Sequence, residues 1–269
     1  MFEIPRLKIR ERTGVYATGQ GRILQILEAA LDVLVEYGYR AVTLREIARR
    51  CNIRVGAIGY YYKSRDDLMQ DLLNAVIASY VEVFDSIRAD TGKSAEERLE
   101  IVIALILDDI QTRKTTRIFP ELWAAANHDP FVATAVDSIY IKARLVLNEL
   151  IRELNPALCD EERETLALFV SASLEGMTVF AGAQKPWASQ MDLIKAIAVG
   201  SLVNTVKATK RESLIASGWK GPRTTAWITP TLLSPDQYAK TVTQSAAVAD
   251  VAMDGESPEL ARGRPKRRA

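Results

Sequence analysis

Histidine and cysteine are scarce in this chain, which holds one histidine and two cysteines among 269 residues. A single histidine cannot build a histidine-based metal site. Cys51 and Cys159 stand alone, outside any paired-cysteine spacing, which predicts reduced thiols in a cytosolic protein. We therefore expect no metal, no disulfide and no cofactor.

Long apolar runs and catalytic signatures are missing as well. The longest strongly apolar run, IVIALIL from Ile101, is far shorter than the ~20 residues that span a membrane. The charged start, MFEIPRLKIRERTG, has no apolar export segment, so we expect a cytoplasmic protein without membrane contact. An enzyme is an alternative class, but no GxSxG, glycine-rich phosphate loop or Cys–His pairing supports it.

Acidic residues are few at both ends of the chain, although the net charge is only +1. Residues 1–65 carry 12 Lys or Arg against 6 Asp or Glu, whereas residues 66–261 carry 18 against 28. The last eight residues, RGRPKRRA, add five positive charges and no negative one. This segregation suggests ends that face nucleic acid on an acidic body, although merely solvated basic ends have the same composition.

Helical periodicity is what the chain has in abundance. Residues 21–38 place Ile23, Leu27, Ala30 and Leu34 on one helix face, and Gly38 is a natural stop. We predict an all-α fold of about nine helices, with no strand before residue 218. The expected helices lie within residues 21–38, 43–51, 55–62, 64–88, 94–114, 116–128, 129–154, 160–182 and 189–217.

Several of these helices have clear start signals. Thr43 and Ser94 each have a glutamate three residues on, the spacing of a capping box, and Ser64 opens a segment rich in acids. Asp129 followed by Pro130 is a further N-cap pattern. Pro120 is tolerated in the first turn of a helix but not in its middle, so the helix within 116–128 should begin close to it.

Residues 43–68 predict two short helices joined by a tight turn and followed by a long helix, which is a helix-turn-helix. Asn52 lies in the turn, where asparagine accepts a positive φ. The inward-facing residues are Ile47, Ala48, Ile53 and Ile58.

The outward face of the second short helix carries arginine, small residues and tyrosines. Small side chains let the backbone enter a DNA major groove about 12 Å wide. Three consecutive tyrosines cannot share one helix face, so we assign Tyr62 to the core and Tyr60 and Tyr61 to DNA. Lys63 and Arg65 flank the start of the long helix, whose free N–H groups suit a phosphate.

The segment TLREIARRCNIRVGAIGYYYKSRDDL resembles the DNA-binding signature of the TetR family of bacterial transcriptional regulators. The preceding helix, RILQILEAALDVLVEYGYRAVTL, is similar too, so the resemblance covers residues 22 to about 70. It departs from the family pattern in three places. Asn52 replaces the usual turn glycine, Gly59 stands where a tyrosine is common, and Arg54 replaces a frequent serine.

The resemblance implies a sequence-specific regulator, most simply a ligand-responsive repressor that binds a palindromic operator in double-stranded DNA as a homodimer. The alternative is a nucleoid-type architectural protein that binds DNA through its basic ends. The predicted DNA-binding residues are Arg22, Thr43, Arg45, Arg54, Val55, Gly56, Ala57, Tyr60, Tyr61, Lys63, Arg65, Arg262 and Arg264.

Both ends of the chain have their own candidate role. The C-terminal Arg-Gly-Arg-Pro resembles an AT-hook core, which lies in a narrow A·T-rich minor groove. A tail that adds affinity only through counterion release is the alternative. The N-terminal arm carries basic residues that suit the minor groove or simply solvent.

The resemblance also implies a dimer interface and an effector cavity in the acidic body. LFVSASLEGMTVF resembles the family's dimerisation helix. The predicted interface residues are Leu168, Ala172, Glu175, Gly176, Val179, Ile194, Ile197, Ser201 and Val206, for which packing inside one chain is the alternative. The predicted pocket for an apolar or amphipathic small molecule comprises Phe119, Trp123, Asn127, His128, Phe131, Met177 and Phe180, with plain core packing as the alternative, or capping in the case of His128.

These assignments divide the chain into four parts. Residues 1–20 form a basic N-terminal arm, and residues 21–66 form the helix-turn-helix domain. Residues 67–217 form a helical domain for effector binding and dimerisation. Residues 218–269 form an irregular tail with the basic, AT-hook-like end.

Overall fold

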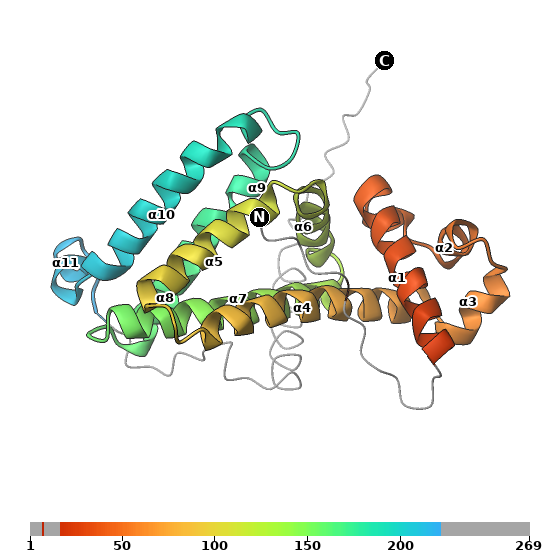
Figure 1. Cartoon of the computed structure of the whole chain (residues 1–269), viewed down its shortest axis with the longest axis horizontal. Helices are drawn as coiled ribbons and strands as arrows, with labels where there is room; N and C mark the ends of the chain where they lie inside the picture. Colours follow the sequence, from red (N-terminus) through yellow and green to blue (C-terminus); the bar gives the residue numbers. More distant parts are fainter. Residues whose placement is uncertain (1–6, 8–16, 222–269) are drawn as a thin grey trace, which may run out of the picture. The chain divides into compact units, whose positions relative to one another are not determined.

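Helices make up all the regular structure of the residues that the computed structural model describes, which are residue 7 and residues 17–221. Figure 1 shows them in chain order, and the all-α prediction is confirmed. The α-helices are α1 Ala17–Tyr37, α2 Leu44–Arg50, α3 Val55–Tyr61, α4 Arg65–Ala89, α5 Ala95–Ile110, α6 Arg113–Ala126, α7 Pro130–Leu154, α8 Asp160–Glu175, α9 Met177–Phe180, α10 Met191–Ala208 and α11 Arg211–Ala216. Two 3₁₀ turns, η1 Tyr39–Ala41 and η2 Ala188–Gln190, complete the described elements.

Two of the predicted helices are each divided in two, so the described residues hold more helices than expected. The segment 160–182 breaks at Gly176, between α8 and α9. The segment 189–217 breaks after α10, where the side-chain amide of Asn155 donates to the carbonyls of Val206 at 2.9 Å and Thr209 at 2.8 Å. This amide satisfies carbonyls that a helix end leaves free, and it comes from a residue that is distant in sequence.

Most of the predicted start signals are confirmed. Ser64 and Ser94 each form a complete capping box, and the Asp129 carboxylate accepts the backbone N–H groups of Phe131 and Val132, which follow Pro130. Thr43 accepts the N–H of Glu46 at 3.2 Å. The carboxylate of Glu46 binds arginines of its own helix instead of completing a box.

The expected position of Pro120 was wrong. Thr112 is the N-cap of α6, so Pro120 lies in the middle of this helix. A proline there removes one hydrogen bond of the helix. The burial of Phe119 and Leu122 on either side of it offsets this cost, which a local pattern does not reveal.

The core consists of two main clusters. α1, α2 and α3 gather at the start of α4, and α5 and α7 lie along its later turns (Figure 1). The first cluster fills the head that α1–α3 and the start of α4 form, yet it also contains Ile118 and Leu122 of α6 and Val132 of α7. The second cluster joins α5, α7, α8 and α10 to the end of α4. The body therefore completes the core of the head, and α4 runs through both clusters.

In the described part of the chain, every helix is too short or too polar to cross a lipid bilayer.

Candidate DNA-binding head and effector cavity

The turn between α2 and α3 has the geometry that the sequence predicts. Asn52 adopts a φ of 52°, and the N–H of Ile53 returns to the carbonyl of Ala48 at 3.0 Å. Ala48 and Ile58 are buried and hold the two short helices together. This packing fixes which face of α3 points outward.

The outward face of α3 is open. Arg54, Val55, Gly56 and Ala57 are all exposed, and a Cβ added to Gly56 would meet no heavy atom of the described residues within 4 Å. Gly59 is equally uncrowded, so a larger contact residue would fit there. The first turn of α3 can therefore approach another molecule with its backbone.

The three consecutive tyrosines have three different environments. Tyr60 is 79% exposed, and Tyr61 is half-buried with its ring edge-on to that of Tyr60 at a centroid distance of 5.1 Å. Tyr62 is 1% exposed and donates its hydroxyl to Asp71 at 2.7 Å. The assignment of Tyr62 to the core is confirmed, and Tyr61 packs partly against the same core.

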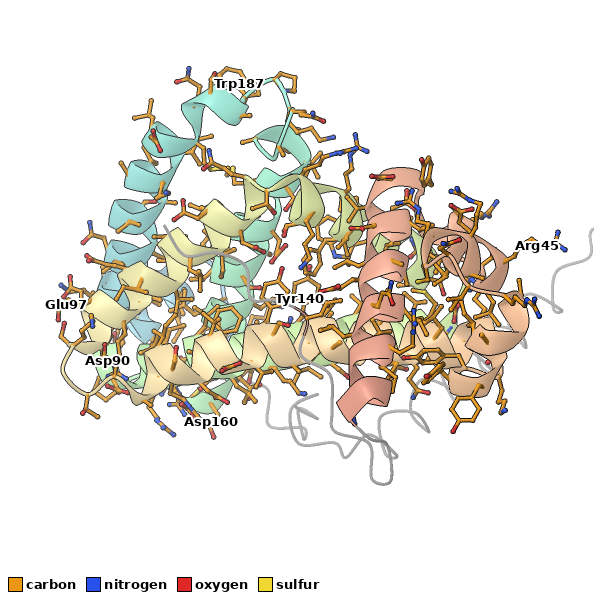
Figure 2. The ribbon with its side chains drawn as sticks, turned by 45° about the vertical axis from the view of Figure 1, so that its right-hand side comes forward. Arg45, Asp90, Glu97, Tyr140, Asp160 and Trp187 are labelled. Carbon is orange, nitrogen blue, oxygen red and sulfur yellow. The ribbon has the colours of Figure 1, made fainter. Side chains whose placement is uncertain are left out.

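The other predicted DNA contacts of the head lie around α3. Thr43, Arg45 and Lys63 are exposed, and Figure 2 shows Arg45 pointing away from the helices. The ammonium of Lys63 binds the carbonyl of Gly59 at 3.1 Å. Arg22 is half-buried and donates to Gln25. Arg262 and Arg264 lie outside the described residues, as do the basic residues of the N-terminal arm.

Arg65 has a role inside the head. Its guanidinium donates to the carbonyls of Val42 at 2.8 Å and Tyr39 at 2.9 Å, and it lies over the ring of Tyr39 at 4.4 Å. These contacts join the start of α4 to the turn before α2. Binding of a phosphate by Arg65 stays a prediction.

An anchor between the head and the body was not foreseen from the sequence. The N–H of Tyr39 donates to Glu121 of α6 at 2.8 Å, and its hydroxyl donates to Asp129 at 3.0 Å. Burial raises the pKa of the Tyr39 hydroxyl. Gly38 has a φ of 84°, and a Cβ there would lie 2.8 Å from the Glu121 carboxylate. The head is thus fixed to α6 at close range.

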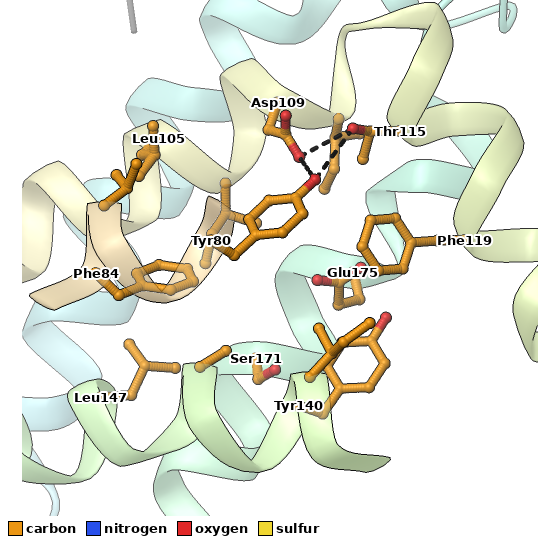
Figure 3. A pocket seen from close by; sticks show the side chains of 15 residues that line it. Tyr80, Phe84, Leu105, Asp109, Thr115, Phe119, Tyr140, Leu147, Ser171 and Glu175 are labelled. Atoms are coloured by element: carbon orange, nitrogen blue, oxygen red, sulfur yellow. Dashed lines mark hydrogen bonds between the residues drawn. The ribbon is translucent and has the colours of Figure 1, made fainter. Parts of the chain in front are cut away.

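A partly open cavity of about 70 Å³ lies between α4, α5, α6, α7 and α8 (Figure 3). Most of its wall is apolar, with carboxyl, hydroxyl and phenol groups at a few points. The lining residues are Tyr80, Val83, Phe84, Leu105, Ile106, Asp109, Ile110, Thr115, Phe119, Ile139, Tyr140, Ala143, Leu147, Ser171 and Glu175.

Asp109 forms the first polar point of the cavity. Its Oδ2 accepts hydrogen bonds from the hydroxyls of Tyr80 at 2.7 Å and Thr115 at 2.9 Å. Its Oδ1 is buried and has no hydrogen-bond partner among the described residues. Burial raises the pKa of Asp109, although its two hydrogen bonds act in the opposite direction.

Glu175 forms the second polar point. Burial raises its pKa to about 7, a hydrogen bond with Tyr140 lowers it, and the charge of Asp109 raises it further. The indole N–H of Trp123 donates to the Tyr140 hydroxyl at 2.9 Å and so fixes this ring. The ring of Phe119 lies 6.1 Å from that of Tyr80 and 6.3 Å from that of Tyr140.

The structure brings only Phe119 of the predicted pocket residues to this cavity. Trp123 lies behind Tyr140, and Phe131 packs against the core of the head. Met177 packs against the second cluster. The remaining members, Asn127, His128 and Phe180, are exposed. The sequence does contain a signal for the residues that line the cavity: Tyr80, Asp109 and Glu175 are polar residues within apolar stretches of their helices.

The predicted interface residues divide into exposed and internal ones. Leu168, Ala172, Gly176, Val179, Ile197 and Ser201 are exposed. Ile194 packs against the second cluster, Val206 is buried in it, and Glu175 lines the cavity. Further exposed apolar side chains lie on or beside α8, α9 and α10, namely Phe169, Phe180, Trp187 and Leu193. An apolar face larger than predicted therefore covers these helices.

Comparison with known proteins matches both halves of the described chain. Residues 26–72 match the family described as bacterial regulatory proteins, tetR family. Residues 95–199 match the family described as BetI-type transcriptional repressor, C-terminal. The HTH-type transcriptional regulators BetI of Klebsiella pneumoniae (strain 342) and Escherichia coli (strain K12) are each 23% identical over 155 residues, covering 57% of this chain and 78% of the relative.

Solved structures share the fold at low identity. A putative transcriptional regulator from Pseudomonas aeruginosa PAO1 aligns with a TM-score of 0.57 at 19% identity, over 71% of this chain and 95% of its own. A putative transcriptional regulator from Saccharomonospora viridis in complex with choline aligns with a TM-score of 0.54 at 18% identity, over 71% and 97%.

Proposed function

Since this chain belongs to the TetR family of bacterial regulatory proteins, we propose that it is a ligand-responsive repressor that binds a palindromic operator as a homodimer. It is a transcriptional regulator by family, and its relatives are regulators rather than enzymes. A regulator of this kind acts on the chromosome, so we expect it in the cytoplasm.

The open face of α3 carries this proposal. Its backbone is accessible at Gly56 and Ala57, and Arg54 and Tyr60 flank this approach on the same short helix. Such a helix fits the major groove, where side chains reach base edges. Arg45 and Lys63 lie where they would neutralise phosphates beside the groove.

A homodimer is supported by the apolar face on α8, α9 and α10. Leu168, Val179 and Ile197 are each about half exposed, at 51%, 50% and 59%. Exposed apolar patches of this kind mark interaction surfaces. A two-fold dimer would pair two heads, each reading one half-site.

The cavity suits a small-molecule effector that acts through α4. Tyr80 and Phe84 of this helix line the cavity, and Leu68 and Leu72 near its start belong to the core of the head. A ligand that shifts α4 would change the separation of the two heads. It does so only if it binds one separation more tightly than the other. A regulator of similar fold was solved in complex with choline, which supports a small-molecule effector.

Footprinting of the purified protein on the DNA beside its own gene tests this function. We expect protection of one palindrome, which is lost when Tyr60 is replaced by alanine. Binding spread over A·T-rich DNA without a preferred site would favour the architectural alternative instead.

A further inference from the structure

We propose that the effector is a small amphipathic amine, whose protonated nitrogen donates a hydrogen bond to Asp109 and lies between Asp109 and Glu175. This inference deepens the proposed function, on which its consequence for DNA rests. The binding step itself can be measured without DNA.

The charge of the cavity favours a cation. Its lining contains two carboxyl groups, Asp109 and Glu175, and no lysine, arginine or histidine among the described residues. Two basic side chains act on the lining from outside it: the charge of Lys114 lowers the pKa of Asp109, and the charge of Arg144 lowers the pKa of Tyr140 against the larger effect of burial. An anionic ligand would therefore meet two carboxyl groups without a facing cation.

The unpartnered oxygen of Asp109 favours a ligand with a hydrogen-bond donor. Oδ2 already accepts from Tyr80 and Thr115, whereas Oδ1 is buried without a partner among the described residues. Buried polar atoms in native proteins are nearly always paired, so Asp109 has an acceptor left over for a donor in the cavity. Oδ1 itself has no accessible surface, so the carboxyl group must turn towards the cavity for the ligand to reach it. A nitrogen with four carbon substituents has no N–H and cannot supply this donor, but a protonated amine can.

The aromatic rings favour the same cationic group. Tyr80, Phe119 and Tyr140 line the same cavity as the two carboxyl groups, with Tyr80 beside Asp109 and with Phe119 and Tyr140 beside Glu175 (Figure 3). A cation over an aromatic face is attracted to it when it lies within about 6 Å of the ring. Trp123 holds the Tyr140 hydroxyl, so this ring is fixed before a ligand arrives.

The rest of the cavity limits the ligand to a small apolar body. Phe84, Leu105 and Leu147 offer no polar partner, and the volume of about 70 Å³ suits a short chain. The pKa of Glu175 is raised to about 7, so near neutral pH part of the ligand-free protein carries a proton on this carboxyl group. A cation would favour the ionised form, so binding near neutral pH should release a proton.

Isothermal titration of the full chain with four small probes tests this inference. The probes are N,N-dimethylbutylamine, butyltrimethylammonium, pentan-1-ol and pentanoate, at about pH 8, where the amine is protonated and Glu175 is ionised. We expect the amine to bind at least about tenfold more tightly than the quaternary ion or the alcohol, and we expect no binding of pentanoate. Equal or tighter binding of the quaternary ion, or of the alcohol, would overturn the proposal.

Two variants test whether Asp109 causes the preference for the amine. Asp109→Asn should remove the preference for the amine over the quaternary ion. Asp108→Asn changes the neighbouring carboxylate, which pairs with Lys195 outside the cavity, and should keep that preference. Both variants are checked for folding by thermal denaturation. Should Asp109→Asn be unfolded, Glu175→Gln provides the second arm, since it removes the other carboxyl group of the cavity and should weaken binding of the amine. Unchanged amine affinity in folded Glu175→Gln protein contradicts the proposal.

The outcome is separable from that of the proposed function. Amine binding without any effect on operator affinity would refute ligand-responsive repression, and only the amine-binding site would stand. Normal operator binding with no amine binding would refute this inference and leave the proposed DNA-binding function standing.

Discussion

The backbone N–H of Tyr39 donates to the carboxylate of Glu121 at 2.8 Å, which ties the turn before α2 to helix α6. The same helix contributes Thr115 and Phe119 to the cavity wall. The carbonyl of Tyr39 in turn accepts a hydrogen bond from Arg65, whose guanidinium also lies over the Tyr39 ring. A second physical route therefore joins the cavity to the head, in addition to α4.

Replacing Glu121 by alanine should weaken this route. The Tyr39 N–H loses its partner, which costs about 1–3 kcal/mol of unfolding free energy. We expect operator binding without effector to persist and the response to effector to shrink, as measured by fluorescence anisotropy on labelled operator. Glu100→Ala removes an exposed carboxylate of α5 and serves as the control. A full effector response in folded Glu121→Ala protein would show that the anchor plays no part in coupling.

Gly38→Ala should destabilise the protein at the same junction. The φ of 84° disfavours any side chain, and the new Cβ would lie 2.8 Å from Glu121 Oε2. We expect a loss of about 1–3 kcal/mol in urea unfolding. Gly21→Ala, in α1 with open space around it, should instead stabilise by about 0.5–1 kcal/mol. Equal effects at both positions would contradict this explanation.

Two tyrosines of the same run, Tyr60 and Tyr62, should separate DNA binding from stability. Tyr60→Ala removes a ring that is 79% exposed, so unfolding free energy should change by less than about 0.5 kcal/mol while operator affinity falls about tenfold or more. Tyr62→Phe removes a buried hydrogen bond to Asp71 and should cost about 1–2 kcal/mol with little loss of affinity per folded molecule. Gel-shift and urea titrations of both variants give the comparison, and retained gel shifts in Tyr60→Ala would contradict the assignment of α3.

Glu175 should make stability depend on pH in the direction opposite to a salt-bridged carboxylate. Its folded pKa of about 7 exceeds the ordinary value of 4.5, because burial penalises the charge. The stability that this group contributes is present below about pH 4.5 and is lost as pH rises towards 7. Glu175→Gln should therefore stabilise the ligand-free protein by about 2–3 kcal/mol at pH 8 and by little at pH 5. Urea unfolding at both pH values checks this, and a gain of the same size at both would refute the burial argument.

Ile197→Glu should separate the proposed dimer. The side chain is 59% exposed, so the charge costs little within one chain but would be buried in the interface. We expect a folded monomer by analytical ultracentrifugation and greatly weakened operator binding. Leu145→Glu, at an apolar position of α7 that is 44% exposed, should remain a dimer. A dimeric Ile197→Glu protein would place the interface elsewhere.

The helical class, the start of most helices and the helix-turn-helix head could all be predicted from the amino-acid sequence. These features follow from local signals: caps at Ser64, Ser94 and Asp129, the positive φ of Asn52, and the burial of Tyr62 that helix geometry requires. Each depends on residues a few positions apart, so periodicity and capping chemistry are enough to find them.

The position of the cavity and the residues that line it depend on how the helices pack against one another. Asp109 and Glu175 are far apart in sequence and come from α5 and α8, and the periodicity of a helix does not say which neighbour its polar residues will face. The end of α10 depends on Asn155, the head depends on Glu121, and Pro120 is held inside α6 by its buried neighbours. Long-range packing overrides local preference at each of these points, because the free energy of burial and of a satisfied polar group exceeds that of the local signal.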